Sequence, residues 1–438
     1  MDLSLSRRAL LAGVGTAAVG GLAGCSGGES DSLEGVTPAR VPPVRRTTPP
    51  LPISTLEVRH QAVADDGPAA AAMNRLVAAF EQRQKTVTVR QVPPDKRPDG
   101  QLTATVERER ALLDYGRAGQ ALAARSDPER SRDLSGVWED RLDFTVPGGV
   151  TDSCYLGMRL VAVPLELHRV NCLYYNPAVV ERAGVDPHAI ESVAGLVAQA
   201  EALADVVETP LAAPGTPTTL LALWESLLGA RIDSLGTFLQ LLSWSVPDHR
   251  PKVAGALSDL DTLLGVASAP AGERSVLDAV VSESVGFVQA PSWAAQSLIA
   301  RPDAAFGENW AVAAVPGTDG SFVFSANAFS VPRRTNRLEV VEAFLALASS
   351  PALQRRFNEI RGSIPPRRDV AAEMSGHEFY ATQSQAYRWA SVTLPSMAYG
   401  LAVASPARQR LLNALVNFQG TRDREQATEQ IQAVFEER

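Results

Sequence analysis

The side chains that usually carry out catalysis are scattered along this chain of 438 residues. The histidines stand far apart, at His60, His168, His188, His249 and His377. None belongs to an HExxH pattern, and the sequence holds no GxSxG nucleophile motif, no phosphate-binding Walker loop and no CxxC pair. Carboxylates are plentiful, but most fall on the polar faces of expected helices, where solvation explains them. The sequence therefore predicts no enzyme, no metal site and no cofactor.

One cysteine stands in a context that specifies its chemistry. Cys25 ends the segment Leu22-Ala23-Gly24-Cys25, a bacterial lipobox in which the cysteine receives acyl chains. Arg7 and Arg8 precede a short apolar stretch, the pattern of a twin-arginine export signal. That stretch is too short and too rich in glycine to suit a membrane-spanning helix. We expect residues 1–25 to be a lipoprotein signal peptide, and acylated Cys25 to anchor the chain at the extracytoplasmic face of the cell membrane.

The two other cysteines, Cys154 and Cys172, leave two interpretations open. Both lie beside the same expected hairpin, and two thiols outside the cytoplasm can form a disulfide. The alternative is a pair of buried, reduced side chains in strands. The spacing of the two residues does not decide between a disulfide and free thiols.

The most informative stretch runs from Leu160 to Pro187 and alternates apolar runs with turn residues. Leu160 to Val163 is expected to form one strand and Cys172 to Tyr175 another, with a polar crossing between them. Residues 178–183 have helical spacing and end at Gly184, a residue typical of a helix C-terminus. The stretch therefore predicts a strand, a crossing, a second strand and a short helix.

This order of elements resembles the crossing between the lobes of family 1 extracellular solute-binding proteins, the receptors of ABC importers. The segment HRVNCLYYN, from His168 to Asn176, is most similar to the glucose- and mannose-binding subgroup. Two further segments match signatures of the family, PGTDGSFVFSANAFSVP from Pro316 to Pro332 and GSIP from Gly362 to Pro365. The resemblance implies an α/β fold of the maltose-binding-protein type. Such a fold has two lobes of interrupted connectivity that close on a carbohydrate about hinge strands.

The resemblance also implies how the chain is divided. Residues 26–52 are rich in Gly, Ser and Pro and are expected to be a flexible tether. The first lobe is expected to comprise residues 53–163 and 286–331, and the second lobe residues 164–285 and 332–438.

Hydrophobic periodicity predicts the elements within these lobes. The first lobe opens with a strand, a helix and a strand at 55–63, 68–83 and 86–92, a parallel unit with a crossover. Residues 102–115 are expected to form a charged helix where the family has a strand, so this lobe is predicted to be shortened. Further helices are expected at 194–204, 220–228, 235–242, 253–264, 338–348, 411–418 and 424–435.

The resemblance further implies which side chains face the cleft. Three of these positions keep the residue types of the family: His168, Asn171 and Trp293. At four others this chain differs from the glucose-type relatives, with Gln61 in place of a tryptophan, Ser292 and Asn327 in place of aspartates, and Tyr399 near an expected histidine. Each lost hydrogen bond to a buried hydroxyl costs about 1 to 3 kcal/mol. Ordinary glucose binding is therefore not expected.

Each retained residue also has a purely structural interpretation. His168 and Arg169 could cap or bridge the crossing. Trp293 begins a helix and could belong to the core, although an aromatic residue directly after a strand of this fold usually faces the cleft. Trp224 lies on the apolar stripe of a helix, which favours the core.

The overall charge limits the choice of partners. A net charge of -8 and a pI near 5.4 provide no basic face for nucleic acid. We expect a monomeric substrate-binding lipoprotein that captures a carbohydrate or related polar solute and docks on ABC importer permease subunits. The alternative is a non-transport descendant of the family that acts as an envelope sensor or a protein-interaction module.

Overall fold

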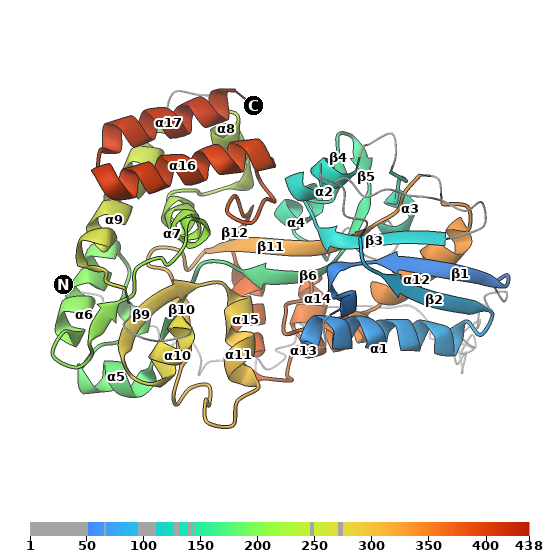
Figure 1. The fold of residues 1–438 in the computed structure, drawn as a ribbon, viewed down its shortest axis with the longest axis horizontal. Coiled ribbons are helices and arrows are strands. Elements are labelled where there is room, and N and C mark those ends of the chain that lie inside the picture. The colour runs from blue at the N-terminus through green and yellow to red at the C-terminus, as the bar shows by residue number, and fades with distance from the viewer. Residues whose placement is uncertain are drawn as a thin grey trace, which may run out of the picture. The chain divides into compact units, whose positions relative to one another are not determined.

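Two β-sheets organise the chain (Figure 1). The structure is a computed structural model, and it describes residues 51–64, 67–94, 111–126, 131–138, 142, 145–245, 249–269, 275–333 and 335–437. The first sheet has the strand order β12 (Val392–Pro395), β11 (Ser321–Ser330), β3 (Ala111–Arg117), β1 (Ser54–Arg59) and β2 (Val87–Val92), and β6 (Ala162–Arg169) also pairs with β11. The second sheet has the order β10 (Ala311–Ala314), β7 (Cys172–Tyr175), β9 (Val285–Ala290) and β8 (Thr209–Leu211). A small hairpin joins β4 (Tyr155–Leu156) to β5 (Arg159–Leu160).

The first sheet begins with the predicted strand–helix–strand unit. β1 and β2 pair in parallel, and α1 (Pro68–Arg83) connects them. α1 starts with a proline, which suits the first turn because its missing N–H would have no partner there. Met73, Leu76 and Phe80 of α1 are buried in the core of the first sheet. The predicted helix at 68–83 is confirmed, and it packs beside α13 (Pro351–Arg361).

The prediction of a charged helix over residues 102–115 was wrong at its C-terminal end. The structure has β3 there, parallel to β1 and antiparallel to β11, with Ala111, Leu112 and Leu113 buried. A short apolar run buried on both faces is typical of a central strand, and the charged residues that precede it obscured this pattern. Residues 102–110 lie outside the described part of the chain. With β3 in place, the strand that was predicted to be missing from the first lobe is present.

The chain crosses from the first sheet to the second between β6 and β7, and the predicted strand at Cys172–Tyr175 is confirmed. The strand predicted at Leu160–Val163 has the wrong bounds, because β6 begins at Ala162 and continues through Pro164 to Arg169, across residues that were expected to form the crossing. Every residue of β6 is buried, and the strand lies antiparallel to β11. β7 begins at Cys172 and pairs with β9 and β10 in the second sheet. The side chain of Asn176 then accepts the N–H of Ala178 and caps α5 (Pro177–Arg182). Gly184 ends the segment with φ 68°, a conformation that favours glycine.

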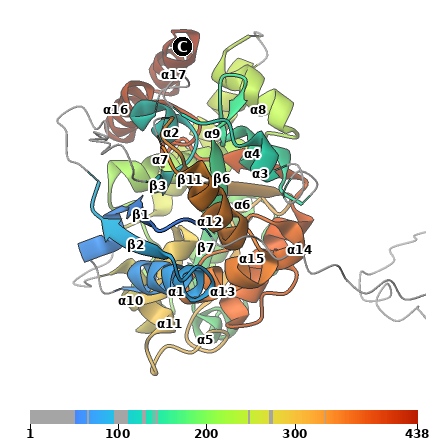
Figure 2. The same cartoon turned by 90° about the vertical axis from the view of Figure 1, so that its right-hand side faces the viewer.

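Helices cover the two sheets (Figures 1 and 2). In the first sheet α12 (Leu338–Ala348) contacts β3 and α13 contacts β6, whereas α6 (Val193–Leu203) and α10 (Val276–Val281) contact the strands of the second sheet. The C-terminal helices α16 (Ser405–Thr421) and α17 (Arg424–Glu436) lie side by side against α7 (Pro217–Gly229) and α9 (Arg250–Val266). The other α-helices are α2 (Gln120–Arg125), α3 (Ser135–Trp138), α4 (Gly148–Asp152), α8 (Leu235–Leu242), α11 (Gln296–Ile299), α14 (Arg368–Ala371) and α15 (Glu378–Trp389).

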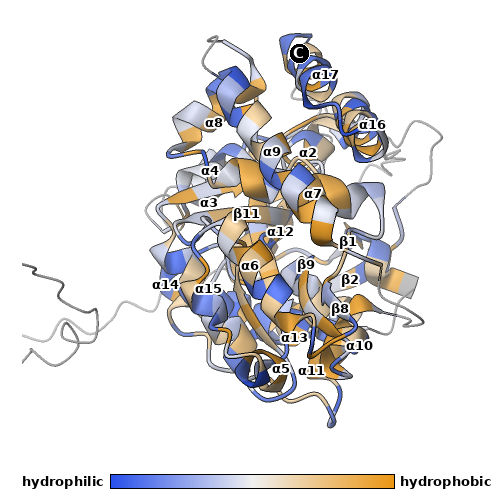
Figure 3. Cartoon of the chain, turned by 90° about the vertical axis from the view of Figure 1, so that its left-hand side faces the viewer, coloured by the Kyte–Doolittle hydropathy of each residue, from blue (hydrophilic) through white to orange (hydrophobic). Residues whose placement is uncertain are grey.

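Buried apolar side chains form three clusters in the described chain. One surrounds the first sheet and includes Phe80, Phe329 and Phe344, and the other two surround the second sheet. α7 is hydrophobic along most of its length, whereas hydrophilic residues are prominent on α17 (Figure 3). The largest cluster also contains Val323 of β11 and Leu394 of β12, so it extends to the first sheet. Residues from Pro50 to Arg438 accordingly form one compact unit.

The predicted lobe boundaries stay a prediction, and the strand pairing suggests how to adjust them. β9 and β10 were assigned to the first lobe, yet both pair with β7 in the second sheet. α12 and α13 were assigned to the second lobe, yet they contact β3 and β6. We propose that residues 285–314 belong to the second lobe and residues 338–371 to the first.

The possible disulfide between Cys154 and Cys172 is not formed, because both residues are free and buried. Cys154 lies in the core of the first sheet and Cys172 in a cluster of the second. β6 runs between them, and its eight extended residues span about 26 Å at roughly 3.3 Å per residue. Two Cα atoms must lie within about 7 Å to be bridged, so of the two interpretations left open by the sequence, the structure has the buried, reduced thiols.

The predictions for the amino terminus lie outside the described residues. These are the export signal at Arg7 and Arg8, the lipidation site at Cys25 and the tether up to residue 50. In the described part of the chain no helix combines the length and the apolar character needed to cross a membrane.

The positions of Cys154 and Cys172 predict their reactivity. Burial raises the pKa of each thiol to about 12 and keeps it protonated and inaccessible. We expect iodoacetamide to label neither residue in the folded protein and both in guanidinium without any reductant, as read by mass spectrometry. Labelling that appears only after reduction would show that the two cysteines are bridged.

Candidate functional site

Four side chains from separate parts of the chain form a continuous group, called here the cleft cluster: Arg117, His168, Trp293 and Tyr399. The rings of Tyr399 and Trp293 meet edge to face with centroids 4.6 Å apart, and those of Trp293 and His168 with centroids 5.5 Å apart. The guanidinium carbon of Arg117 lies 5.5 Å from the centre of the Tyr399 ring. The structure therefore brings together three of the predicted ligand residues and adds an arginine that the sequence analysis missed.

The cleft cluster draws on both sheets. Arg117 is the last residue of β3 and His168 lies on β6, so both belong to the first sheet. Trp293 lies in the short helix η6 (Ser292–Ala295), just beyond the end of β9 in the second sheet. Ser292 fixes this turn, because its Oγ accepts the backbone N–H of Arg169 at 3.0 Å. His168 and Trp293 consequently meet where the two sheets adjoin.

A buried carboxylate lies next to His168. Glu166 is fully buried, with the Nε of Arg361 2.9 Å from its Oε2, and the side-chain amide of Asn327 donates to its Oε1. Burial acts to raise the pKa of Glu166, but Arg361, His168 and the bond from Asn327 outweigh burial and leave this pKa below its ordinary value. Glu166 is therefore ionised and already paired.

His168 itself is a neutral imidazole. Burial, and after it the charge of Arg361, lowers the pKa of His168 to about 3. Its Nε2 lies 3.9 Å from Glu166, too far for a hydrogen bond, and neither ring nitrogen has a hydrogen-bond partner among the described residues. A neutral imidazole has one donor and one acceptor, so His168 can offer both to a bound hydroxyl.

A second buried carboxylate positions Tyr399. Glu225 of α7 accepts the hydroxyl of Ser396 at 2.5 Å and the N–H groups of Met397 and Ala398 at 2.6 and 3.0 Å. These residues begin the loop 396–402, called here the Tyr399 loop. Burial raises the pKa of Glu225 to about 7 in spite of these hydrogen bonds. A lone glutamate among the apolar residues of LALWESLL is the sequence signal that could have revealed it.

The Tyr399 loop is also bound from the side of the first sheet. Gln120 and Ala121, at the start of α2, donate their N–H groups to carbonyl oxygens of the loop at 2.8 and 2.9 Å. Gly119 lies so close to the loop that a Cβ atom would stand 2.2 Å from the carbonyl oxygen of Leu401, and its φ of 64° also favours glycine. α2 and α7 thus fix the loop from two sides.

The remaining predicted ligand residues lie outside the cleft cluster. Asn171 is fully buried: its Nδ2 donates to Thr318 Oγ1 at 2.9 Å and to the Ser321 carbonyl at 3.0 Å, and its Oδ1 accepts the Val323 N–H at 3.1 Å. Ser292 and Asn327 bond to Arg169 and Glu166 as described above. Gln61 is exposed in η2 (Gln61–Ala64), directly after β1.

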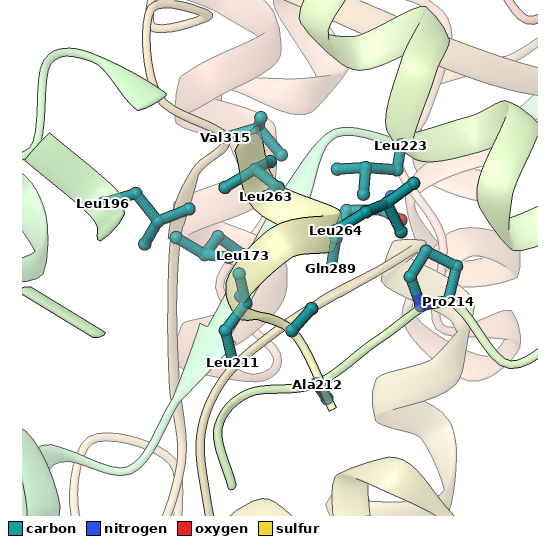
Figure 4. A pocket seen from close by; sticks show the side chains of 11 residues that line it. Leu173, Leu196, Leu211, Ala212, Pro214, Leu223, Leu263, Leu264, Gln289 and Val315 are labelled. Carbon is teal, nitrogen blue, oxygen red and sulfur yellow. The ribbon is translucent and has the colours of Figure 1, made fainter. Parts of the chain in front are cut away.

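Two cavities lie apart from the cleft cluster. One of about 270 Å³ is lined by residues of α2, α4, β4 and α8 together with Leu401 and Ala402 of the Tyr399 loop. The other, of about 20 Å³, lies in the second lobe among leucines and Gln289 (Figure 4). The amide of Gln289 already donates to the Val170 carbonyl at 2.7 Å. This small cavity has room for about one water molecule and none for a sugar.

Metal chemistry finds no support in the described residues, which contain no group of three or more His, Cys, Asp or Glu side chains that could hold an ion.

The buried bonds of Asn171 predict the effect of removing them. We expect Asn171→Ala to lower the free energy of unfolding by about 2 to 4 kcal/mol, since it strands a buried carbonyl and a buried N–H. Urea unfolding measures this loss, and the exposed Asn413→Ala provides a control that should shift it by no more than about 0.5 kcal/mol. A loss below about 1 kcal/mol for Asn171→Ala would contradict the assigned bonds.

The raised pKa of Glu225 predicts a pH dependence. A carboxyl whose folded pKa lies near 7 instead of 4.5 stabilises the fold most below pH 4.5, and this stabilisation fades as the pH rises toward 7. Glu225→Gln removes this titration, so the stability of the wild type relative to Glu225→Gln should decline between pH 4.5 and 7. Urea unfolding of both proteins across this pH range measures the difference between their free energies of unfolding. The other titratable groups are the same in the two proteins, so their contributions cancel in this difference. A difference that does not change with pH would refute the shift.

Comparison with known proteins places the chain in a family. Residues 75–386 match the family described as bacterial extracellular solute-binding protein. The xylose/arabinose-binding protein XacG of Haloferax volcanii is 28% identical over 371 residues, which are 80% of this chain and 77% of that protein. A probable sugar-binding periplasmic protein of Brucella suis is 25% identical over 293 residues, or 63% and 66% of the two chains.

Solved structures share the fold at lower identity. The bacterial solute receptor AcbH superposes with a TM-score of 0.68 at 16% identity, over 87% of this chain and 97% of its own. A probable secreted solute-binding lipoprotein of Streptomyces coelicolor gives 0.67 at 20% identity, over 88% and 98%. Maltose-bound MalE3 of T. maritima gives 0.64 at 16% identity, over 87% and 99%. These likenesses confirm the predicted α/β, two-lobed fold of the maltose-binding-protein type.

The family match covers most of the chain and includes Arg117, His168 and Trp293 of the cleft cluster. The protein belongs to the bacterial extracellular solute-binding protein family.

Proposed function

We propose that this protein captures a carbohydrate between its two lobes outside the cytoplasm and delivers it to the permease subunits of an ABC importer. The main support is the cleft cluster, in which His168 of the first sheet meets Trp293 at the end of a strand of the second, while Arg117 of the first sheet lies over the Tyr399 ring that Trp293 also contacts. Aromatic rings beside a few convergent polar groups are typical of sugar sites.

The side chains that contact the solute come from both lobes, and this explains why binding closes the lobes. A solute that touches both His168 and Trp293 gains its full set of contacts only when the two lobes are together. It therefore stabilises the closed form over the open one, the hinge mechanism of binding proteins. An importer that recognises the closed form would then accept only the loaded protein.

The names of the relatives support the same proposal. XacG is described as binding xylose and arabinose, and the Brucella suis protein as probably binding sugar. A further relative, from Pyrococcus horikoshii, is described as the extracellular-binding protein of an ABC transporter. They do not favour the alternative, a sensor or interaction module that has lost transport. We further propose that the protein acts as a monomer attached to the membrane through acylated Cys25 after twin-arginine export.

The predicted site residues divide into two roles in this proposal. His168, Trp293 and Tyr399 contact the solute, whereas Gln61 is exposed directly after β1 and is given no contact with it. Asn171, Ser292 and Asn327 act through other residues, because their polar atoms already bond to protein groups.

A thermal-shift screen of the purified protein against pentoses, hexoses, disaccharides and polyols tests the proposal. A sugar at a hundred times its dissociation constant stabilises the fold by about 2.7 kcal/mol, which is an easily measured rise in melting temperature. Failure of every sugar in the panel to raise the melting temperature would count against carbohydrate capture.

The role of Trp293 gives a sharper prediction. We expect Trp293→Ala to weaken the binding of the best sugar by about tenfold or more in calorimetric titration, because it removes the ring that faces His168 and Tyr399. Trp389→Ala is the matched control, since that indole is 72% exposed at the end of α15. Equal affinities for Trp293→Ala and the wild type would exclude the cleft cluster as the sugar site.

A further inference from the structure

The cleft cluster lies among more arginines than carboxylates, although the whole chain has a net charge of -8. The charges of Arg361 and Arg117 both lower the pKa of His168, and the charge of Arg408 lowers the pKa of Arg117. The buried carboxylates at this place in the described chain are Glu166 and Glu225. The site therefore differs in the sign of its charge from the protein as a whole.

Both carboxylates are fully engaged. Glu166 faces the Nε of Arg361 at 2.9 Å and also accepts from Asn327. Glu225 accepts three hydrogen bonds from the Tyr399 loop. Neither of these carboxylates bonds to Arg117.

Arg117 has no carboxylate partner among the described residues. Its Nη1 donates to the carbonyl oxygen of Tyr399 at 2.8 Å, and the guanidinium lies over the Tyr399 ring. Partial burial, and after it the like charge of Arg408, lowers the pKa of Arg117. The side chain is nevertheless partly exposed, so its remaining N–H groups can meet a solute.

A second guanidinium lies behind it. One nitrogen of Arg125 donates to the carbonyl oxygen of Arg117, and its Nη2 is buried without a hydrogen-bond partner in the described residues. The guanidinium carbon lies 3.3 Å from where a Cβ of Gly116 would stand, so the glycine leaves room for it. The nearest carboxylate, Asp114, already pairs with the Nε of Arg59 at 2.6 Å. Arg59 and Arg125 thus share one negative charge.

Building on the proposed function, we propose that the solute is an anionic sugar, whose carboxylate or phosphate group binds the fork of Arg117 while its ring rests against the edge-to-face pair of Trp293 and Tyr399. Removing a cation from water is costly unless an anion and hydrogen bonds offset the loss, and the buried Nη2 of Arg125 lacks that compensation. Arg117 is exposed and has no carboxylate partner among the described residues, so an anion can reach it. A guanidinium presents paired N–H groups that match the two oxygens of a carboxylate or phosphate. Neutral His168 then forms hydrogen bonds with the hydroxyl groups of the sugar without adding charge to the site.

Calorimetric titration of the full chain with matched sugars tests this charge preference. The probes are D-glucuronate and D-galacturonate, their methyl esters, D-glucose 6-phosphate, and the neutral sugars D-glucose, D-galactose, D-xylose and L-arabinose. An anionic sugar should bind at least about tenfold more tightly than its neutral counterpart, and its affinity should fall as salt increases. A preference for the uronates identifies a carboxylate, and a preference for the phosphate ester identifies a phosphate.

Two variants assign the effect to Arg117. Arg117→Gln should weaken binding of the anionic sugar by about 10- to 100-fold, a much larger loss than for the neutral sugars. Arg90→Gln is the matched control, because Arg90 is exposed on β2, pairs with Glu57 at 3.1 Å and should not affect either kind of sugar. Melting temperatures of both variants check that the fold is intact.

The outcomes separate this inference from the proposed function. Tight binding of a neutral sugar, with esters equal to acids or with Arg117→Gln affecting both alike, would overturn the anionic preference and leave carbohydrate capture standing. Binding of no sugar, charged or neutral, would overturn both.

Discussion

The side-chain amide of Asn171 fixes the point at which the chain leaves one sheet for the other. Its bonds to Thr318, Ser321 and Val323 attach the crossing to the start of β11. β6 ends just before this point and β7 begins just after it, so the same contact aligns both strands. His168 depends on this alignment directly, and Trp293 depends on it through the bond from Arg169 to Ser292. An asparagine without solute contact thus determines whether the aromatic groups of the two lobes can meet.

Buried charges organise the other side of the site. Glu225 is bonded to the Tyr399 loop from α7, while α2 bonds to the same loop from the first sheet, so hydrogen bonds from two sides hold Tyr399 in place. Glu166 and Arg361 neutralise one another beside His168. What remains is a neutral imidazole, two aromatic rings and a partly exposed guanidinium. In the proposed function, their combination gives a chain with scattered histidines and no catalytic motif the groups needed to recognise a sugar.

The sequence predicted most of what local patterns and family signatures encode. The helix at 68–83, the strands around the crossing, and the meeting of His168, Trp293 and Tyr399 followed from periodicity, turn residues and resemblance. β3 was mistaken for a helix, because a short apolar run does not reveal whether it is buried on both faces. The roles of Arg117 and Glu225 could not be predicted from spacing. Each depends on a partner far away in sequence, Tyr399 for one and Ser396 for the other.

The central claim is that a sugar binds where the two sheets adjoin and touches groups from both. A crystal structure of the protein with the sugar that stabilises it most measures this directly. The predicted result is a sugar ring against Trp293 and Tyr399, with hydroxyl groups bonded to His168 and further contacts from the end of β3. A sugar bound in the 270 Å³ cavity beside α8, or one that contacts residues of a single sheet, would contradict the claim.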